Sequence, residues 1–321
     1  MTGPDASAHD RKHRSAPAAE GRWPTFLVIG AGRCGTTTLH GLLLQHPRVL
    51  IPPIKEPNYF AMRALDIDYE ALSVSARIAW ADSISDPDAY RALFAPPPRP
   101  QPPTPQVPQP GNEPIAADGP LPPETVPPPD SPPDPPPDPV AFGECSPVYL
   151  AVAGVARLIR DAVPDVRLIA ILRDPVDRAI SHHAHNVACG IDPEPDFEKA
   201  LIADQAMGEH ANYLFHGRYA DRLEPFARQF DREQILLLDY GAFAADPLAI
   251  MNRIFTHIGV EPLAAMTTDL RALPSTPAPI PDDVRRRLAA LFADDTRNLV
   301  ERYGFEPARA WSSYPTEPAS A

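Results

Sequence analysis

The sequence is poor in cysteine and has no long apolar run, and each absence narrows the class of protein. Three cysteines, Cys34, Cys145 and Cys189, lie scattered among 321 residues without the spacing of metal ligands. They predict free thiols in a reducing compartment and no metal site. The sequence shows neither the apolar core of a signal peptide nor a run of about twenty apolar residues, the length of a membrane-spanning helix. We therefore expect a cytoplasmic protein without stable membrane insertion.

Basic side chains are also scarce. The chain has 29 lysines and arginines against 42 acidic residues, a formal net charge of −13. General nucleic-acid binding and attraction to anionic membranes both need a basic surface, so the composition argues against either partner. A nucleotide pocket is still compatible with this charge, because a few arginines can create a local positive potential.

Proline, by contrast, is abundant, and half of the positions from 96 to 139 are proline. Such a segment cannot donate backbone hydrogen bonds or bury apolar surface, which predicts a disordered, polyproline-like insertion. It could bind SH3-like or WW-like domains, but a spacer within one domain is the favoured interpretation. Residues 1–22 and 309–321 are expected to be tails, the first disordered, which leaves one domain over residues 23–308.

The most informative stretch covers residues 26–60. A short apolar run, FLVI, is typical of a buried strand and ends at Gly30. From Thr36 the apolar residues follow a helical period, with Leu39 and Leu42 on one face. A strand, a glycine-rich turn and a helix N-terminus together form a cradle for an anion, since free N–H groups and the helix dipole favour negative charge.

This turn departs from the phosphate loop of nucleotide hydrolases at one position. Gly30 and Gly35 match the glycines of G-x-x-x-x-G-K-[ST], but Thr36 stands where that motif has lysine. The cation is instead Arg33, inside the loop, and Thr37 keeps the hydroxyl that would hold magnesium. The loop therefore predicts binding of an anionic nucleotide without metal-assisted transfer of a γ-phosphate.

Strands and helices are expected to alternate along the rest of the domain. Apolar runs predict strands at 49–51, 167–172 and 234–238, and helical periodicity predicts helices at 148–162, 176–188, 247–258 and 281–303, with further helical patterning after 197 and over 213–230. This alternation predicts an α/β fold, with a central parallel sheet that helices cover on both faces.

A second cation lies directly after one of these strands. Arg173 follows the apolar run, and Ser181 lies two turns into the next helix. Because parallel strands end at the same edge of a sheet, Arg173 should lie on the same edge as Arg33. Two separate anion contacts suit a ligand with two phosphate groups, one held by Arg173 and Ser181. Alternatively, Arg173 pairs with Asp174 or Asp177 and Ser181 lies on the surface.

Together these segments resemble the sulfotransferase family, enzymes that use 3′-phosphoadenosine 5′-phosphosulfate (PAPS). The resemblance covers roughly residues 26–305 apart from the insertion, and favours the carbohydrate branch that acts on heparan sulfate and its bacterial relatives. It rests on four motifs: Gly30-x-x-Arg33-x-Gly35-Thr36-Thr37, Lys55-Glu56-Pro57-Asn58-Tyr59-Phe60, Gly143-Glu144-x-Ser146-Pro147-x-Tyr149, and Arg173-Asp174-Pro175 with Ser181.

The resemblance implies a P-loop-like sheet and transfer of the sulfuryl group to a hydroxyl of a carbohydrate or small metabolite, with release of 3′,5′-ADP. It implies that Glu56 is the general base, that Lys55 either stabilises the sulfuryl oxygens or orients Glu56, and that Arg33 stabilises the leaving charge. The residues implied for the donor are Arg33, Cys34, Gly35, Thr36, Thr37 and Thr38 around the 5′-phosphosulfate, and Arg173 and Ser181 around the 3′-phosphate.

Two other functions stay open. The first is a P-loop kinase or hydrolase, in which Asp239, after Leu236-Leu237-Leu238, would hold magnesium. The second is a non-catalytic scaffold that presents the proline-rich segment. His182, His183 and His185 are expected to point in different directions on a helix, which favours packing over a metal site. A basic loop for the 3′-phosphate is not evident near 273–281, where Arg271 is a weak substitute.

Overall fold

The computed structural model describes residues 21–67, 82–95, 138–206, 212–267 and 280–315. Residues 1–20 and 96–137, which hold nearly all of the expected N-terminal tail and proline-rich insertion, lie outside the described residues, as does Arg271.

A five-stranded parallel sheet forms the centre of the molecule, in the order β2-β3-β1-β4-β5. This confirms the predicted fold class. The strands are β1 (Phe26–Gly30), β2 (Val49–Leu50), β3 (Ala141–Cys145), β4 (Arg167–Leu172) and β5 (Ile235–Asp239). The strand β3 was not predicted, because its sequence AFGEC interrupts an apolar run with a glycine and an acid.

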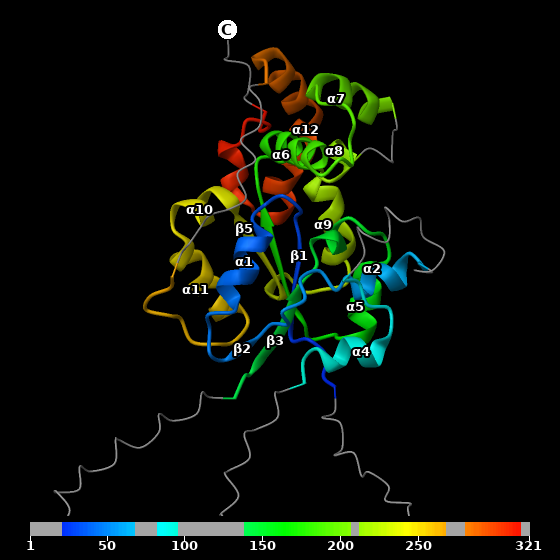
Figure 1. Ribbon diagram of the computed structural model, residues 1–321. Helices are drawn as coiled ribbons and strands as arrows, with labels where there is room; N and C mark the ends of the chain where they lie inside the picture. The colour runs from blue at the N-terminus through cyan, green and yellow to red at the C-terminus, as the bar shows by residue number, and fades with distance from the viewer. Residues whose placement is uncertain (1–20, 68–81, 96–137, 207–211, 268–279, 316–321) are drawn as a thin grey trace, which may run out of the picture.

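Helices cover both faces of the sheet (Figure 1). On one side lie α1 (Thr36–Leu43), α10 (Tyr240–Ala245) and α11 (Pro247–His257), and on the other α2 (Tyr59–Ala64), α4 (Pro87–Ala92), α5 (Val155–Ala162) and α9 (Tyr219–Ala227). Beyond the carboxyl ends of the strands lie α6 (Pro175–Ala188), α7 (Phe197–Ala206), α8 (Asn212–Phe215) and α12 (Asp282–Tyr303). Short 3₁₀ turns complete the fold: η2 (Pro147–Leu150), η4 (Arg232–Gln234) and η5 (Glu306–Ala310).

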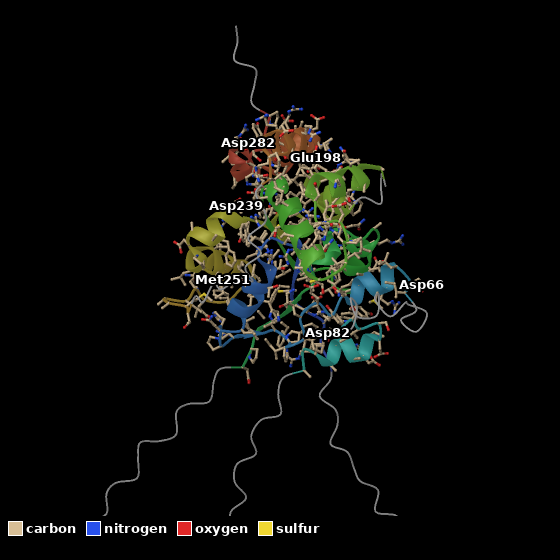
Figure 2. All side chains as sticks on the ribbon, turned by 45° about the horizontal axis from the view of Figure 1, so that its top comes forward. Asp66, Asp82, Glu198, Asp239, Met251 and Asp282 are labelled. Carbon is tan, nitrogen blue, oxygen red and sulfur yellow. The ribbon has the colours of Figure 1, made fainter. Side chains whose placement is uncertain are left out.

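The sheet is buried on both faces, which explains why its strands read as continuous apolar runs rather than as alternating patterns. Every residue of β1 is buried, and β4 is buried from its second residue onward. Side chains fill the space between the sheet and the helices throughout the molecule (Figure 2). None of the helices in the described ranges combines the length and the apolar character that crossing a bilayer requires.

The expected helix over 148–162 is wrong, because the chain breaks in its middle. The turn η2 follows Pro147, and Gly154 then adopts a φ of 85° before α5 begins at Val155. A left-handed conformation of this kind favours glycine, so Gly154 ends one turn and starts the next helix. Helical periodicity alone does not detect such a break.

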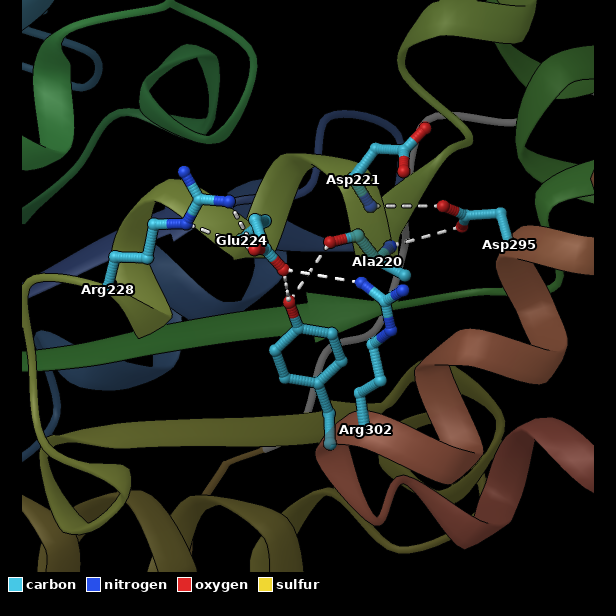
Figure 3. Close-up of polar contacts among 7 residues, drawn as sticks. Ala220, Asp221, Glu224, Arg228, Asp295 and Arg302 are labelled. Carbon is cyan, nitrogen blue, oxygen red and sulfur yellow. Dashed lines mark hydrogen bonds and ion pairs between the residues drawn. The ribbon is translucent and has the colours of Figure 1, made fainter.

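Polar contacts hold the long helix α12 against α9 (Figure 3). The Asp295 carboxylate accepts hydrogen bonds from the N–H groups of Ala220 (3.1 Å) and Asp221 (3.0 Å) at the start of α9. The Tyr303 hydroxyl donates to the Ala220 carbonyl at 3.2 Å. Burial raises the pKa of Asp295 to about 6, although these N–H donors favour its charged form. These contacts direct the chain after α12 toward the carboxyl edge of the sheet.

The segment after α12 packs on the ends of two strands. Trp311 Nε1 donates to Asp239 Oδ1 at 3.2 Å, and the Ser312 N–H donates to Asp174 Oδ2 at 2.6 Å. Ser313 is buried. The packed chain therefore continues past residue 308, where the sequence suggests that a tail begins.

Candidate functional site

A cleft of about 880 Å³ opens at the carboxyl edge of the sheet. Most of its lining comes from the loop between β1 and α1, from α1 itself, from the segment between β2 and α2, and from one face of α6. The turn η2, the residue after β4, the start of α10, Gln45, His216 and Thr267 complete it. With one exception, the predicted site residues meet in this cleft: Arg33, Gly35, Thr36, Thr37, Thr38, Lys55, Glu56, Arg173 and Ser181.

The exception is Cys34. Its side chain is fully buried, and its Sγ lies 3.7 Å from the Tyr219 hydroxyl on the interior side of the loop. Burial raises the pKa of this thiol, so it is neither a nucleophile nor an anion contact. Cys34 can offer a ligand only its backbone.

The loop of residues 33–38, called the anion loop below, has the backbone of an anion cradle. Arg33 adopts a φ of 68° and Gly35 a φ of 85°. A Cβ on Gly35 would lie 3.0 Å from the Tyr240 ring, so both the conformation and the space demand glycine. Gly35 is also the N-cap of α1 and no side chain caps that helix, so its first N–H groups are free for a ligand.

Arg33 and Arg173 are cations without an acidic partner among the described residues. Arg33 Nε is buried and makes no hydrogen bond. Burial lowers the pKa of Arg33, and the nearby charge of Arg173 acts in the same direction. Leaving a buried charged donor unpaired is costly, so this arrangement favours an anionic ligand that pairs with it.

The two aspartates that could pair with Arg173 are engaged elsewhere. Asp174 accepts hydrogen bonds from the N–H groups of Val176 (2.9 Å) and Ser312 (2.6 Å), and Asp177 pairs with Arg285 at 2.6 Å. The Arg173 guanidinium instead lies over the Tyr240 ring, 4.9 Å from its centroid. Its backbone carbonyl accepts a hydrogen bond of 2.9 Å from Tyr219.

Lys55 and Glu56 form an ion pair in the irregular segment between β2 and α2. The Glu56 side chain is 41% exposed, so its carboxylate is accessible to a ligand in the cleft. Glu56 is the one acidic side chain that lines the cleft, among the residues that the structure covers.

One face of α6 lines the cleft, and apart from Ser181 its residues were not predicted from the sequence. Its cleft residues share the helical spacing i, i+3, i+4, i+7 and i+8, and are Arg178, Ser181, His182, His185 and Asn186. His183 turns away, and its Nε2 lies 2.8 Å from the Glu194 carbonyl oxygen. The expectation that the three histidines point in different directions thus holds for His183 alone, because His182 and His185 line the same cleft. The helical spacing within 176–188 is the signal that could have identified this face.

His182 is held neutral on this wall. Arg178 Nη1 donates to His182 Nδ1 at 3.3 Å, which leaves the proton of the imidazole on Nε2. Burial lowers the pKa of His182 to about 2, with the charge of Arg178 as a further cause. His182 therefore offers the cleft a hydrogen-bond donor without charge. Burial also lowers the pKa of His185, and Arg33 adds to this effect.

Asp239 lies at the end of β5 (labelled in Figure 2), but its carboxylate is occupied. Oδ1 accepts from Trp311 Nε1 at 3.2 Å, and Oδ2 caps α10 by accepting from the Ala242 N–H at 2.8 Å. It does not line the cleft. This argues against Asp239 as a magnesium ligand in a nucleotide hydrolase.

Comparisons with known proteins agree with this geometry. A model of the sulfotransferase family matches residues 137–264. Mouse heparan sulfate glucosamine 3-O-sulfotransferase 3B1 is 28% identical over 121 residues, which are 37% of this chain and 31% of the mouse enzyme. Human heparan sulfate glucosamine 3-O-sulfotransferase 6 is 24% identical over 267 residues, 80% of this chain and 60% of the human enzyme. The match thus spans less than two thirds of either relative.

A solved structure resembles the chain over nearly its whole length. The crystal structure of a sulfotransferase from Alicyclobacillus acidocaldarius superposes with a TM-score of 0.65 at 26% identity, covering 89% of this chain and 99% of that protein. With an anion cradle after β1 and a second arginine after β4, the chain resembles the sulfotransferase family, whose model matches residues 137–264.

Proposed function

We propose that the protein transfers the sulfuryl group of PAPS to a hydroxyl group of a carbohydrate or small metabolite. The observation that carries this proposal is the pair of arginines, Arg33 and Arg173, that face one cleft without acidic partners among the described residues. A donor with anionic groups at both its 3′ and 5′ positions would pair with both.

The residues of the cleft fit such a donor. The anion loop would hold the 5′-phosphosulfate through backbone N–H groups and Arg33, whose unpaired Nε is the best support for a ligand there. Arg173 can bind the 3′-phosphate bidentately, and the Ser181 hydroxyl, which lines the same cleft, can add a donor. Curated relatives are named for heparan sulfate, which makes a glycan one candidate acceptor.

Glu56 would act as general base. Its carboxylate takes the proton of the acceptor hydroxyl, whose oxygen then forms a bond to sulfur. The bond between sulfur and the bridging oxygen breaks, and the electron pair stays on 3′,5′-ADP. Arg33 and the N–H groups of the anion loop stabilise that charge, while Lys55 holds Glu56 through their ion pair.

A comparison of nucleotides tests the donor. Thermal unfolding is followed with 3′,5′-ADP in the presence of EDTA, with 5′-AMP, and with Mg·ATP. We expect the largest stabilisation from 3′,5′-ADP, a smaller one from 5′-AMP, which lacks the 3′-phosphate, and little from Mg·ATP. A preference for Mg·ATP would contradict the proposal and favour a kinase or hydrolase.

The acceptor is identified by transfer of label. Incubating the protein with ³⁵S-PAPS and a cell extract, then isolating the labelled product, gives the acceptor class directly. A variant without residues 96–139 should retain donor binding and transfer. Loss of both in a folded variant would instead support the scaffold function of that segment.

A further inference from the structure

The segment that carries Glu56, residues 55–60, is called the base segment below. Before α2 begins at Tyr59, it forms neither helix nor strand. Glu56 adopts a φ of 62° and Asn58 a φ of 51°, in the left-handed region that residues with a Cβ rarely occupy. Such conformations persist only where the surrounding structure holds them.

Three of the holding contacts come from one short stretch, residues 145–149, called the β3 turn below. Alternate N–H groups of the base segment donate to groups of the β3 turn. The pairs are Glu56 N–H to the Cys145 carbonyl oxygen (3.1 Å), Asn58 N–H to Ser146 Oγ (3.0 Å) and Phe60 N–H to the Tyr149 hydroxyl (3.3 Å). Two further contacts come from residues 83 and 84: the Ile84 N–H donates to the Pro57 carbonyl (2.8 Å), and Asn58 Nδ2 donates to Ser83 Oγ (3.1 Å). The β3 turn thus binds three N–H groups of the base segment.

The β3 turn is itself joined to the strand that carries the anion loop. The Ser146 N–H donates to the Val28 carbonyl in β1 at 3.1 Å. Ser146 and Tyr149 are both fully buried, and neither lines the cleft. Ser146 therefore bonds β1 through its main chain and the base segment through its side chain.

A buried layer supports these contacts from behind. The Tyr90 hydroxyl donates to Glu144 Oε1 at 3.1 Å, directly before the β3 turn. The Tyr90 ring stacks on Tyr59 with centroids 4.3 Å apart, and Phe60 packs edge-on against Tyr149 at 5.8 Å. The start of α2 is thereby fixed on the side away from the cleft.

We propose that Ser146 and Tyr149 are positioning residues for the proton transfer assigned to Glu56, an inference that rests on the proposed function. Neither side chain reaches the substrates. Their hydroxyl oxygens hold the N–H groups of Asn58 and Phe60, which both follow Pro57, while the Cys145 carbonyl holds the Glu56 N–H. Together these contacts keep the Glu56 backbone in its left-handed conformation and its carboxylate at the cleft. Loss of either oxygen displaces the base without touching the anion loop.

Two variants test this: Ser146→Ala and Tyr149→Phe each remove one accepting oxygen. Transfer is measured as 3′,5′-ADP released from PAPS, with the labelled extract fraction as acceptor. We expect kcat to fall about ten-fold, since small displacements of a catalytic group are costly. The Kd of 3′,5′-ADP should stay within about two-fold. Amide hydrogen exchange should become faster at residues 56–60 and stay unchanged at 33–38.

A double-mutant cycle separates positioning from general loss of stability. In a Glu56→Gln background, Ser146→Ala and Tyr149→Phe should lower kcat no further, because the group that they position is already inactive. Tyr303→Phe is the matched control: it removes a tyrosine hydrogen bond between α12 and α9, away from the cleft, and should leave kcat unchanged.

The outcomes distinguish this inference from the proposed function. An unchanged kcat in both variants, or an equal loss in the Glu56→Gln background, would overturn the positioning inference. Normal turnover of Glu56→Gln itself would overturn the assignment of the base. If Ser146→Ala does not fold, Tyr149→Phe, which keeps the buried ring, decides the question alone.

Discussion

The cleft has two sides: the anion side, with the anion loop and Arg173, and the base side, with the base segment. The chain forms these two sides in different ways. The anion loop joins a strand and a helix that are adjacent in sequence, and β1 pairs with a neighbour on each side. The base segment has no such pairing and depends on hydrogen bonds to residues 88 and 89 positions away. One side is therefore formed by local chain geometry and the other by tertiary contacts.

This contrast predicts that the two sides of the cleft control different steps. Changes on the anion side should alter donor affinity, while changes on the base side should alter the rate at which bound donor reacts. Three variants test that division, and a fourth tests the buried support of the base segment. A variant that changes donor affinity and rate equally would contradict the division.

Glu56→Gln should have the largest effect. The amide keeps the size of the side chain but cannot accept the proton, so kcat should fall roughly 10²- to 10⁴-fold. The Kd of 3′,5′-ADP should not change, because Glu56 makes no contact proposed for the donor. Steady-state kinetics and calorimetric titration measure the two quantities. A weaker Kd in this variant would show that the two sides are not separate.

Arg173→Ala should weaken binding of 3′,5′-ADP about 10- to 100-fold, the loss expected for hydrogen bonds to a charged group. Affinity for 5′-AMP should change little, because that nucleotide lacks the 3′-phosphate. Arg285→Ala is the control, since Arg285 pairs with Asp177 and does not line the cleft. Equal losses for both nucleotides would argue against Arg173 as the 3′-phosphate contact.

Glu144→Gln should change how stability depends on pH. Burial raises the pKa of Glu144 from its ordinary 4.5 to about 7. Between these values the folded protein keeps a proton that the unfolded chain releases, so the contribution of Glu144 to stability falls as pH rises through this window. Glutamine cannot ionise, so from pH 5 to pH 8 the variant should gain about 2 kcal/mol in unfolding free energy relative to the parent protein.

Urea unfolding of both proteins across that pH range measures the difference. A constant difference between the two proteins would mean that Glu144 is already charged at pH 5. Glu144 directly precedes the β3 turn. The variant therefore also tests whether the buried layer behind the base segment stabilises the fold.

Trp311→Phe should have the smallest effect. It removes the N–H donated to Asp239, which caps the helix that begins with Tyr240 beneath Arg173. We expect the Kd of 3′,5′-ADP to weaken about three- to five-fold, because the lost hydrogen bond affects Arg173 only indirectly, with kcat unchanged. Nucleotide titration and steady-state kinetics measure these two effects. A fall in kcat without a change in Kd would contradict the assignment of Trp311 to the anion side.

The sequence predicted where the residues around the anion loop lie, because the information for their placement is mostly local. A strand, a glycine turn and a helical period lie within residues 26–43, and parallel strands bring Arg173 to the same edge. The alternative, in which Arg173 pairs with Asp174 or Asp177, does not occur, because Ser312 and Arg285 from the far end of the chain bind these two aspartates.

The roles of Lys55 and Glu56 on the base side could be predicted only from the resemblance to a known family. Nothing in residues 55–60 indicates that Asn58 and Phe60 bond to Ser146 and Tyr149, and β3 itself is too short and mixed to predict from its pattern. The break at Gly154 was missed for a similar reason, because a left-handed glycine does not interrupt an apolar period.

Because Ser146 fastens the Glu56-bearing stretch straight to β1, the spacing between proton acceptor and phosphosulfate cradle does not depend on the polypeptide that links Ala95 with Asp138. Changes in the length or composition of that connector should therefore leave the rate of transfer unchanged, which makes it a suitable place to insert new sequence.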